Sequence, residues 1–192
     1  MAAQGDPSMP ETARRPFASP PPLEVDPVTG HMTLWDVPVW LLSPQYYAEM
    51  QVELETLSGK ASKGVLYRVA FRSGRRAVEA LGLACPAETP DAECAARLRR
   101  LEDIALAAGH GFSEISTGDL AKREVTWIIE HSLLATLHAR SAEPVCHYYE
   151  GFLAGFVTTV LGAPVEGREM ECRAKGDAHC VFHTKTTGTA PF

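Results

Sequence analysis

The stretch EMECRAKGDAHC near the end of the chain contains two cysteines, two glutamates and a histidine. A tight turn at the Gly-Asp pair would place Cys172 and Cys180 nearly opposite each other on adjacent strands. Two thiolates in this arrangement can share a metal ion. A twist or bulge in the first strand would bring the carboxylate of Glu169 to the same ion, with Glu171 and His179 as competing ligands.

A structural zinc ion has four ligands in a tetrahedral arrangement, so the hairpin needs one more. Cys146 is the best candidate, because it lies in the first turn of the predicted helix before the hairpin, where the helix dipole favours a thiolate. The spacing is not that of a CxxC knuckle, and it leaves two other interpretations open. The cysteines are unliganded thiols, or Cys172 and Cys180 form a reversible disulfide.

The first half of the chain is expected to form a strand pair and then three helices. The strand pair is predicted in GHMTLWDVPVWLL, with its bend at residues 36–38. Helical spacing predicts helices from Pro44 to Gly59, over KASKGVLYRVAFRSGRRAVEALG, and from Thr89 to Gly109. The apolar side of the second helix is predicted to be Leu66, Val69, Ala70, Ala77, Val78 and Leu81.

The second half is expected to add strands and one long helix. Two or three strands are predicted between GFSEIST and REVTWIIEHSLLATLHA. The stretch SAEPVCHYYEGFLAGFVTTVLG predicts a helix with Ser141 as its cap, Pro144 in its first turn and Gly162 at its end. Two strands, at about 164–174 and 179–185, complete the chain. The order predicts an α+β fold in which helices cover an antiparallel sheet.

Length and composition are those of one globular domain in a chain of 192 residues. Residues 1–22 hold six prolines and almost no periodic apolar pattern, which predicts a disordered or arm-like lead-in. We expect the single domain at 23–186 and a short tail at 187–192.

Net charge and hydropathy bear on partners and location. A net charge of -6 argues against binding nucleic acid through a broad basic face. No apolar run approaches the roughly 18 residues of a membrane span, and the N-terminus lacks the apolar region of a secretory signal. We therefore expect a cytoplasmic protein that contacts neither nucleic acid nor membrane.

The stretch EPVCHYYEGFLAGF…GREMECRAKGDAHCVF resembles the 4-vinyl reductase domain family. The longer span 25–182 resembles the N-terminal aromatic-sensing domains of bacterial activators of phenol, xylene and toluene catabolism, including VDPVTGHMTLWDVPVWLL and GVLYRVAFRSGRRAVEALG. In that family, a cysteine after Glu-Pro-Val and the Glu, Cys and Cys that follow at this spacing bind zinc. The resemblance implies the ligands Cys146, Glu169, Cys172 and Cys180.

Four protein ligands close the coordination sphere of zinc, whereas a catalytic zinc keeps one position open. The implied zinc is therefore structural, and we expect a protein that is not an enzyme. Three thiolates and a carboxylate leave a formal charge of about -2 around Zn²⁺, which nearby donors should offset. Arg173, Lys175 and backbone N–H groups are the candidates.

The related sensors hold a small aromatic effector in an apolar pocket, where a tryptophan and a histidine contact its hydroxyl. Trp127 matches that tryptophan, and Arg99 stands where the phenol-type sensors place the histidine. Because an arginine suits a carboxylate, one hypothesis is a ligand with an acidic group. The alternative is that Arg99 belongs to a solvated helix face.

Three further residues are candidates for the ligand pocket. Val125 should share a strand face with Trp127. Tyr148 and Phe152 lie at helical spacing on the helix that follows Cys146. The alternative for all of these side chains, Trp127 included, is an ordinary place in the hydrophobic core.

These expectations favour a non-catalytic, zinc-containing sensor or binding protein for a small aromatic or hydrophobic molecule, linked to regulation of aromatic compound catabolism. The resemblance implies a homodimer that pairs through its N-terminal region, and a protein partner that carries the output. The alternative is a tetrapyrrole-binding accessory protein of bacteriochlorophyll synthesis. Neither a GxxxxGK[ST] phosphate loop nor a GxGxxG nicotinamide fingerprint occurs in the sequence. A third interpretation is an interaction module without a ligand.

Overall fold

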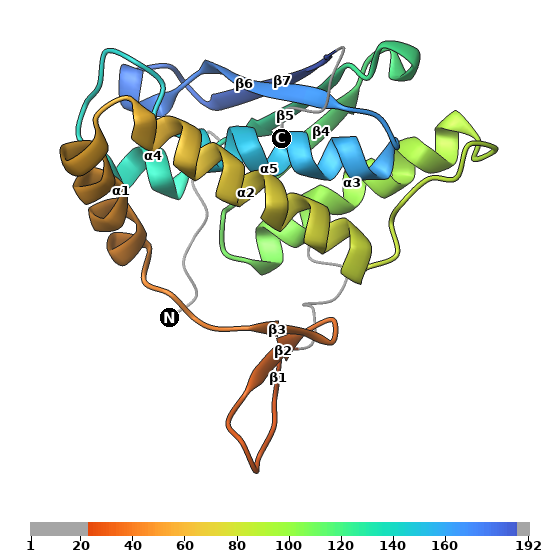
Figure 1. Cartoon of the computed structure of the whole chain (residues 1–192), viewed down its shortest axis with the longest axis horizontal. Helices are drawn as coiled ribbons and strands as arrows, with labels where there is room; N and C mark the ends of the chain where they lie inside the picture. Colours follow the sequence, from red (N-terminus) through yellow and green to blue (C-terminus); the bar gives the residue numbers. More distant parts are fainter. Residues whose placement is uncertain (1–22, 188–192) are drawn as a thin grey trace, which may run out of the picture.

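The computed structural model describes residues 23–187. The predicted lead-in at 1–22 and residues 188–192 of the predicted tail lie outside this range. Within it, helices cover antiparallel sheets, which confirms the α+β class (Figure 1). No helix in the described range is long and apolar enough to cross a membrane.

A small three-stranded antiparallel sheet begins the described chain and projects away from the main body (Figure 1). The predicted strand pair is present, but its turn lies at Trp35 and Asp36, not at the predicted residues 36–38. Both turn residues have positive φ values, of 49° and 61°, as a two-residue hairpin turn requires. Val37 and Pro38 are poorly suited to such values and pair in the strand instead. The strands are β1 (Leu23–Val25), β2 (Met32–Leu34) and β3 (Val37–Val39).

The three predicted helices of the first half are confirmed as α1 (Pro44–Ser58), α2 (Ala61–Ala80) and α3 (Asp91–Ala107). Proline starts α1, and Gly59 caps its end with a φ of 55°. The predicted apolar side of α2 is correct except at Val69, which is 58% exposed, so the buried face is narrower than predicted.

The main sheet contains four antiparallel strands in the order β4-β5-β7-β6. Two strands of the predicted two or three occur in the middle of the chain. The second half of REVTWIIEHSLLATLHA forms a short helix instead, because the Ser132 hydroxyl accepts the N–H of Ala135 at 3.2 Å and caps it. The elements are β4 (Ser113–Thr117), β5 (Val125–Ile129), α4 (Leu133–Leu137), β6 (Val165–Glu171) and β7 (Cys180–Thr186).

The long helix α5 (His147–Val160) starts later than predicted. Ser141 does not cap it, because its hydroxyl accepts the nearby N–H of Glu143 at 3.1 Å in a local turn. The segment that contains Pro144 lies outside the helix, and Cys146 is the N-cap. The predicted end is correct, since Gly162 follows the helix with a φ of 64°.

Glycines allow α2 and α5 to pack backbone to backbone across one face of the main sheet (Figure 1). A Cβ at Gly151 would lie 2.1 Å from the carbonyl oxygen of Tyr67, and one at Gly155 would lie 2.0 Å from that of Phe71. Gly74 faces α5 in the same way, at 2.3 Å from the carbonyl oxygen of Phe152. The expected close packing of α5 is therefore confirmed. The opposite side of α5 packs on the sheet and forms the core.

Candidate metal centre and ligand cavity

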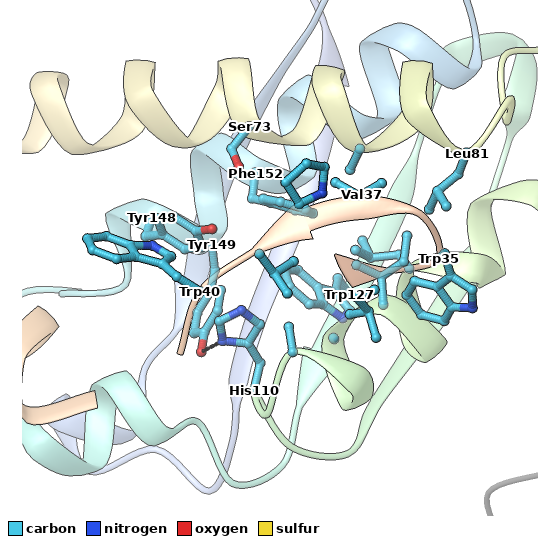
Figure 2. A pocket seen from close by; sticks show the side chains of 18 residues that line it. Trp35, Val37, Trp40, Ser73, Leu81, His110, Trp127, Tyr148, Tyr149 and Phe152 are labelled. Carbon is cyan, nitrogen blue, oxygen red and sulfur yellow. Dashed lines mark hydrogen bonds between the residues drawn. The ribbon is translucent and has the colours of Figure 1, made fainter. Parts of the chain in front are cut away.

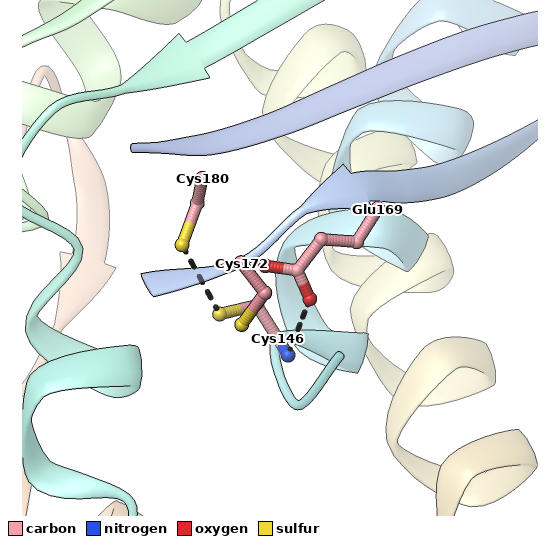
Figure 3. Close-up of side chains that lie close together, drawn as sticks. All are labelled: Cys146, Glu169, Cys172 and Cys180. Atoms are coloured by element: carbon pink, nitrogen blue, oxygen red, sulfur yellow. Dashed lines mark hydrogen bonds between the residues drawn. The ribbon is translucent and has the colours of Figure 1, made fainter. Parts of the chain in front are cut away.

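The four predicted zinc ligands come together at the N-terminus of α5 (Figure 3). One possible ligand atom from each lies within 4.8 Å of every other, and all four residues are buried. The group consists of Cys146, Glu169, Cys172 and Cys180. The competing Glu171 and His179 are exposed and outside the group.

A bulge in β6 explains why Glu169 joins the cysteines. The register between β6 and β7 shifts between Glu169 and Glu171, so one residue of β6 is left without a partner. The side chain of Glu169 then faces the cluster, where its carboxylate accepts the N–H of Cys146 at 2.9 Å. Its second oxygen, Oε1, is buried and has no hydrogen-bond partner among the described residues.

The geometry of the thiols suits a tetrahedral metal ion. The Sγ atoms of Cys146 and Cys180 lie 3.8 Å apart. A tetrahedral ion with metal–sulfur bonds of about 2.3 Å, the value for zinc, separates two sulfurs by about 3.8 Å. Three soft thiolates and one carboxylate favour zinc over hard cations such as magnesium or calcium. The donor set therefore fits the metal that the sequence predicts.

Burial controls the protonation of the metal-free cluster. It raises the pKa of Glu169 to about 8, against the opposing effect of the Cys146 N–H. The pKa of Cys172 is well below the usual value, because Cys146 and Cys180 hydrogen-bond to its sulfur. A divalent cation among these atoms would replace the retained protons and favour the ionised forms.

The expected charge compensation is present in the backbone and absent from the two basic side chains. The N–H of Arg173 points at Sγ of Cys180 at 3.4 Å. Its guanidinium instead donates to the carbonyl oxygens of Glu130 and Ala178, at 3.1 and 2.8 Å. Lys175 pairs with Asp177 at 3.5 Å.

A cavity of about 370 Å³ lies beside α5, between the main body and the small first sheet (Figure 2). Its walls come from the first sheet, α2, α3, the loop after α3, β5 and α5. The lining residues are Leu34, Trp35, Val37, Pro38, Val39, Trp40, Ser73, Ala77, Leu81, Leu101, Ile104, Ala105, Ala108, His110, Trp127, Tyr148, Tyr149 and Phe152.

Three of the five predicted ligand-binding residues line the cavity: Trp127, Tyr148 and Phe152. Val125 is buried on the same strand face as Trp127 but is outside the lining. Arg99 is exposed on α3 and is likewise outside it. The structure therefore does not bring the arginine to the tryptophan, although their sequence match to the sensors suggested it.

The polar groups of the cavity are uncharged. Nδ1 of His110 pairs with the hydroxyl of Tyr149 at 3.1 Å, and burial lowers the pKa of His110 to about 4. Nε1 of Trp127 is buried without a hydrogen-bond partner among the described residues. No Asp, Glu, Lys or Arg of the described range lines the cavity.

Sequence reasoning missed His110, Tyr149 and the wall from the first sheet. His110 follows the glycine that ends α3, where no periodic pattern marks a side chain as inward-facing. Tyr149 lies within the predicted helix but was not selected, although Trp127 packs edge-on against it with ring centroids 5.5 Å apart. A hydroxyl and an imidazole at neighbouring places in space give no signal along the sequence.

Residues 126–186 match the family model of the 4-vinyl reductase domain, which confirms the resemblance to this family in that part of the chain. No curated protein sequence matches the chain. Solved structures with a similar fold include the phenol-responsive sensory domain of the transcription activator PoxR, crystallised with phenol. It has a TM-score of 0.72 and 21% sequence identity, and the alignment covers 85% of this chain and 84% of that one.

Two more distant structures share the fold. A vinyl-4-reductase family protein from Methanocaldococcus jannaschii has a TM-score of 0.53 at 18% identity, over 78% of this chain and 84% of that one. A trafficking protein particle complex subunit 3 from Naegleria fowleri, covalently bound to palmitic acid, has a TM-score of 0.51 at 13% identity, over 78% of this chain and 98% of that one.

Proposed function

We propose that this protein is a non-catalytic sensor or carrier whose cavity binds a small, uncharged, largely apolar molecule, an aromatic one above all. The cavity beside Trp127 is the observation that carries the proposal. Its volume of about 370 Å³ and its mainly apolar walls are typical of a small-molecule site. The similar PoxR domain was crystallised with phenol, and the similar Naegleria protein carries a fatty acyl group, so the fold accommodates apolar ligands.

The cavity's chemistry selects a neutral ligand over the acidic one considered from sequence. A carboxylate would lose its hydration in the cavity and would meet no cation among the described lining residues. Nε1 of Trp127 can donate one hydrogen bond to a ligand oxygen, and the neutral imidazole of His110 adds a second polar group. A phenol or an aromatic alcohol meets these requirements.

Calorimetry with phenol, toluene and benzoate tests the proposal. We expect phenol to bind at least tenfold more tightly than benzoate, because only benzoate must bury a charge. Trp127→Phe keeps the aromatic wall but removes the N–H, so phenol should lose about 3- to 10-fold in affinity while toluene is unchanged. The matched control is Arg99→Ala, which lies outside the cavity. Equal or tighter binding of benzoate, or a dependence of binding on Arg99, would contradict the proposal.

The proposed role of the zinc ion is structural. Four protein ligands would fill its coordination sphere and leave no position for a substrate. Bound zinc would connect the start of α5 to the turn between β6 and β7, and so would fix the end of the helix that carries Tyr148 and Tyr149 into the cavity.

The proposed regulatory role requires a homodimer and an output partner. Apolar side chains of the first sheet and the segment after it are exposed, and they could pair in a second copy. Trp40 is 76% exposed, Leu41 75% and Val28 91%. The first sheet also forms a cavity wall, so a ligand that prefers one position of this sheet would change the dimer surface. We place this switch in the regulation of aromatic compound catabolism.

The match to the 4-vinyl reductase domain supports a second candidate, an accessory protein that binds a tetrapyrrole. The two candidates differ in colour, since a bound tetrapyrrole absorbs strongly in the visible range. Protein purified from its own host should be colourless under the first proposal. A visible absorption band that co-purifies with the protein would favour the second.

A further inference from the structure

Glu150 lies behind the metal centre and makes two buried hydrogen bonds from its carboxylate. One oxygen accepts the backbone N–H of Glu169 at 2.8 Å. The other pairs with Nδ1 of His147 at 2.9 Å, one helical turn earlier on α5. The side chain of Glu150 is 15% exposed and that of His147 is 8% exposed. A carboxylate at this depth that accepts a backbone N–H fixes the position of the N–H strongly.

Glu169 needs such a partner because of its position in the sheet. β6 is an edge strand of the four-stranded sheet, and Glu169 begins the bulge in its pairing with β7. An outward N–H on an edge strand has no neighbouring strand to accept it. Glu150 is the acceptor, so the start of the bulge is held by α5 rather than by the sheet.

Two bonds therefore connect α5 and β6 in opposite directions. The N–H of Cys146 donates to the carboxylate of Glu169, and the N–H of Glu169 donates to the carboxylate of Glu150. The first aims the Glu169 carboxylate toward the thiols, and the second fixes the backbone from which that side chain extends. Close packing supports both, because a Cβ at Gly167 would lie 2.4 Å from the carbonyl oxygen of Glu150.

We propose that Glu150 is a positioning residue of the metal centre, which holds the Glu169 carboxylate in place beside the three thiols and thereby sets the affinity for zinc. This rests on the proposed zinc site. Groups that orient a metal ligand typically contribute about 10- to 100-fold to metal affinity. Loss of Glu150 should release the bulge, and the carboxylate of Glu169 would then spend part of its time away from the metal.

The test is a double-mutant cycle read by zinc affinity, measured in competition with a chelator of known affinity. We expect Glu150→Ala to weaken zinc binding by about 10- to 100-fold. In a Glu169→Ala background the same change should weaken it by less than about threefold, because Glu150 acts through Glu169. Glu150→Gln, which keeps one acceptor oxygen for the N–H of Glu169, should restore most of the affinity. Glu166→Ala, on the same strand and paired with Arg168 at 3.1 Å, is the control and should change nothing.

The outcomes separate this proposal from the zinc site itself. Wild-type protein that binds no zinc would overturn both. Wild-type zinc affinity in Glu150→Ala would overturn the positioning role alone, and so would an equal loss of affinity in both backgrounds. If Glu150→Ala does not fold, Glu150→Asp replaces it in the same cycle, since it keeps the charge but shortens the reach by one methylene.

Discussion

The contact between α2 and α5 gives the sharpest quantitative prediction, at Gly155. Replacing it with alanine would add a Cβ 2.0 Å from the carbonyl oxygen of Phe71 and 2.7 Å from its carbonyl carbon. Ordinary contacts of this kind begin at 3.4 Å. The obstacle is helix backbone, which cannot rotate away as a side chain can. The two helices must therefore separate by about 1 Å or more along their shared length.

Separation of the helices costs more than alanine gains. Alanine in place of glycine within a helix contributes about 1 kcal/mol of stability. Overpacking in a close-packed interior typically costs about 1–3 kcal/mol, and the separation also removes contacts at Gly151 and Gly74, where the backbones approach as closely. We expect Gly155→Ala to lower the free energy of unfolding by about 2–4 kcal/mol.

Urea denaturation followed by far-UV circular dichroism, in zinc-replete buffer, measures this free energy. Gly64→Ala is the matched control, because Gly64 lies in α2 with nothing within 4 Å of the new Cβ. The control should gain up to about 1 kcal/mol. Gly155→Ala as stable as the wild type, or a gain equal to that of the control, would refute the close packing of α2 and α5.

Three further predictions concern protonation, metal and assembly. The pKa of His110 is lowered to about 4 from 6.5, so the folded state binds fewer protons; stability should be complete above about pH 6.5 and fall toward pH 4 by about 3 kcal/mol. His110→Gln should reduce this pH dependence of the unfolding free energy, and an unchanged slope would contradict it. Cys180→Ser should lose zinc by mass spectrometry and lower the melting temperature, whereas Cys94→Ser, a buried cysteine outside the cluster, should keep its zinc. The double substitution Trp40→Ser and Leu41→Ser should convert a dimer into a monomer by light scattering; a monomeric wild type would contradict the assignment of this surface.

The helices and the metal cluster could be predicted because their signals are local or survive as fixed spacings. Proline at the start and glycine at the end delimit α1, and apolar periodicity identifies α2 and α5. The choice of Glu169 over Glu171 depended on the family resemblance. Its physical cause is the bulge in β6, and strand periodicity alone does not reveal a bulge.

The start of α5 could not be predicted, because long-range contacts override local propensity there. Ser141 and Pro144 are typical of a helix start, yet the chain stays irregular until Cys146. The side chain of Gln51 on α1 donates to the carbonyl oxygen of Val145 at 2.9 Å, and Glu169 accepts the N–H of Cys146. Contacts with residues 94 and 23 positions away in sequence therefore fix where the helix begins.

The difference between Arg99 and His110 changes the ligand that the protein is expected to bind. Sequence position placed Arg99 where the phenol-type sensors have a histidine, and its charge favoured an acidic ligand. In the structure the arginine is exposed, and a histidine from the next loop faces Trp127 and Tyr149 across the cavity. Burial keeps that histidine neutral at physiological pH. The charge that suggested an acid therefore lies in solvent, and the groups that can contact a ligand favour a neutral one.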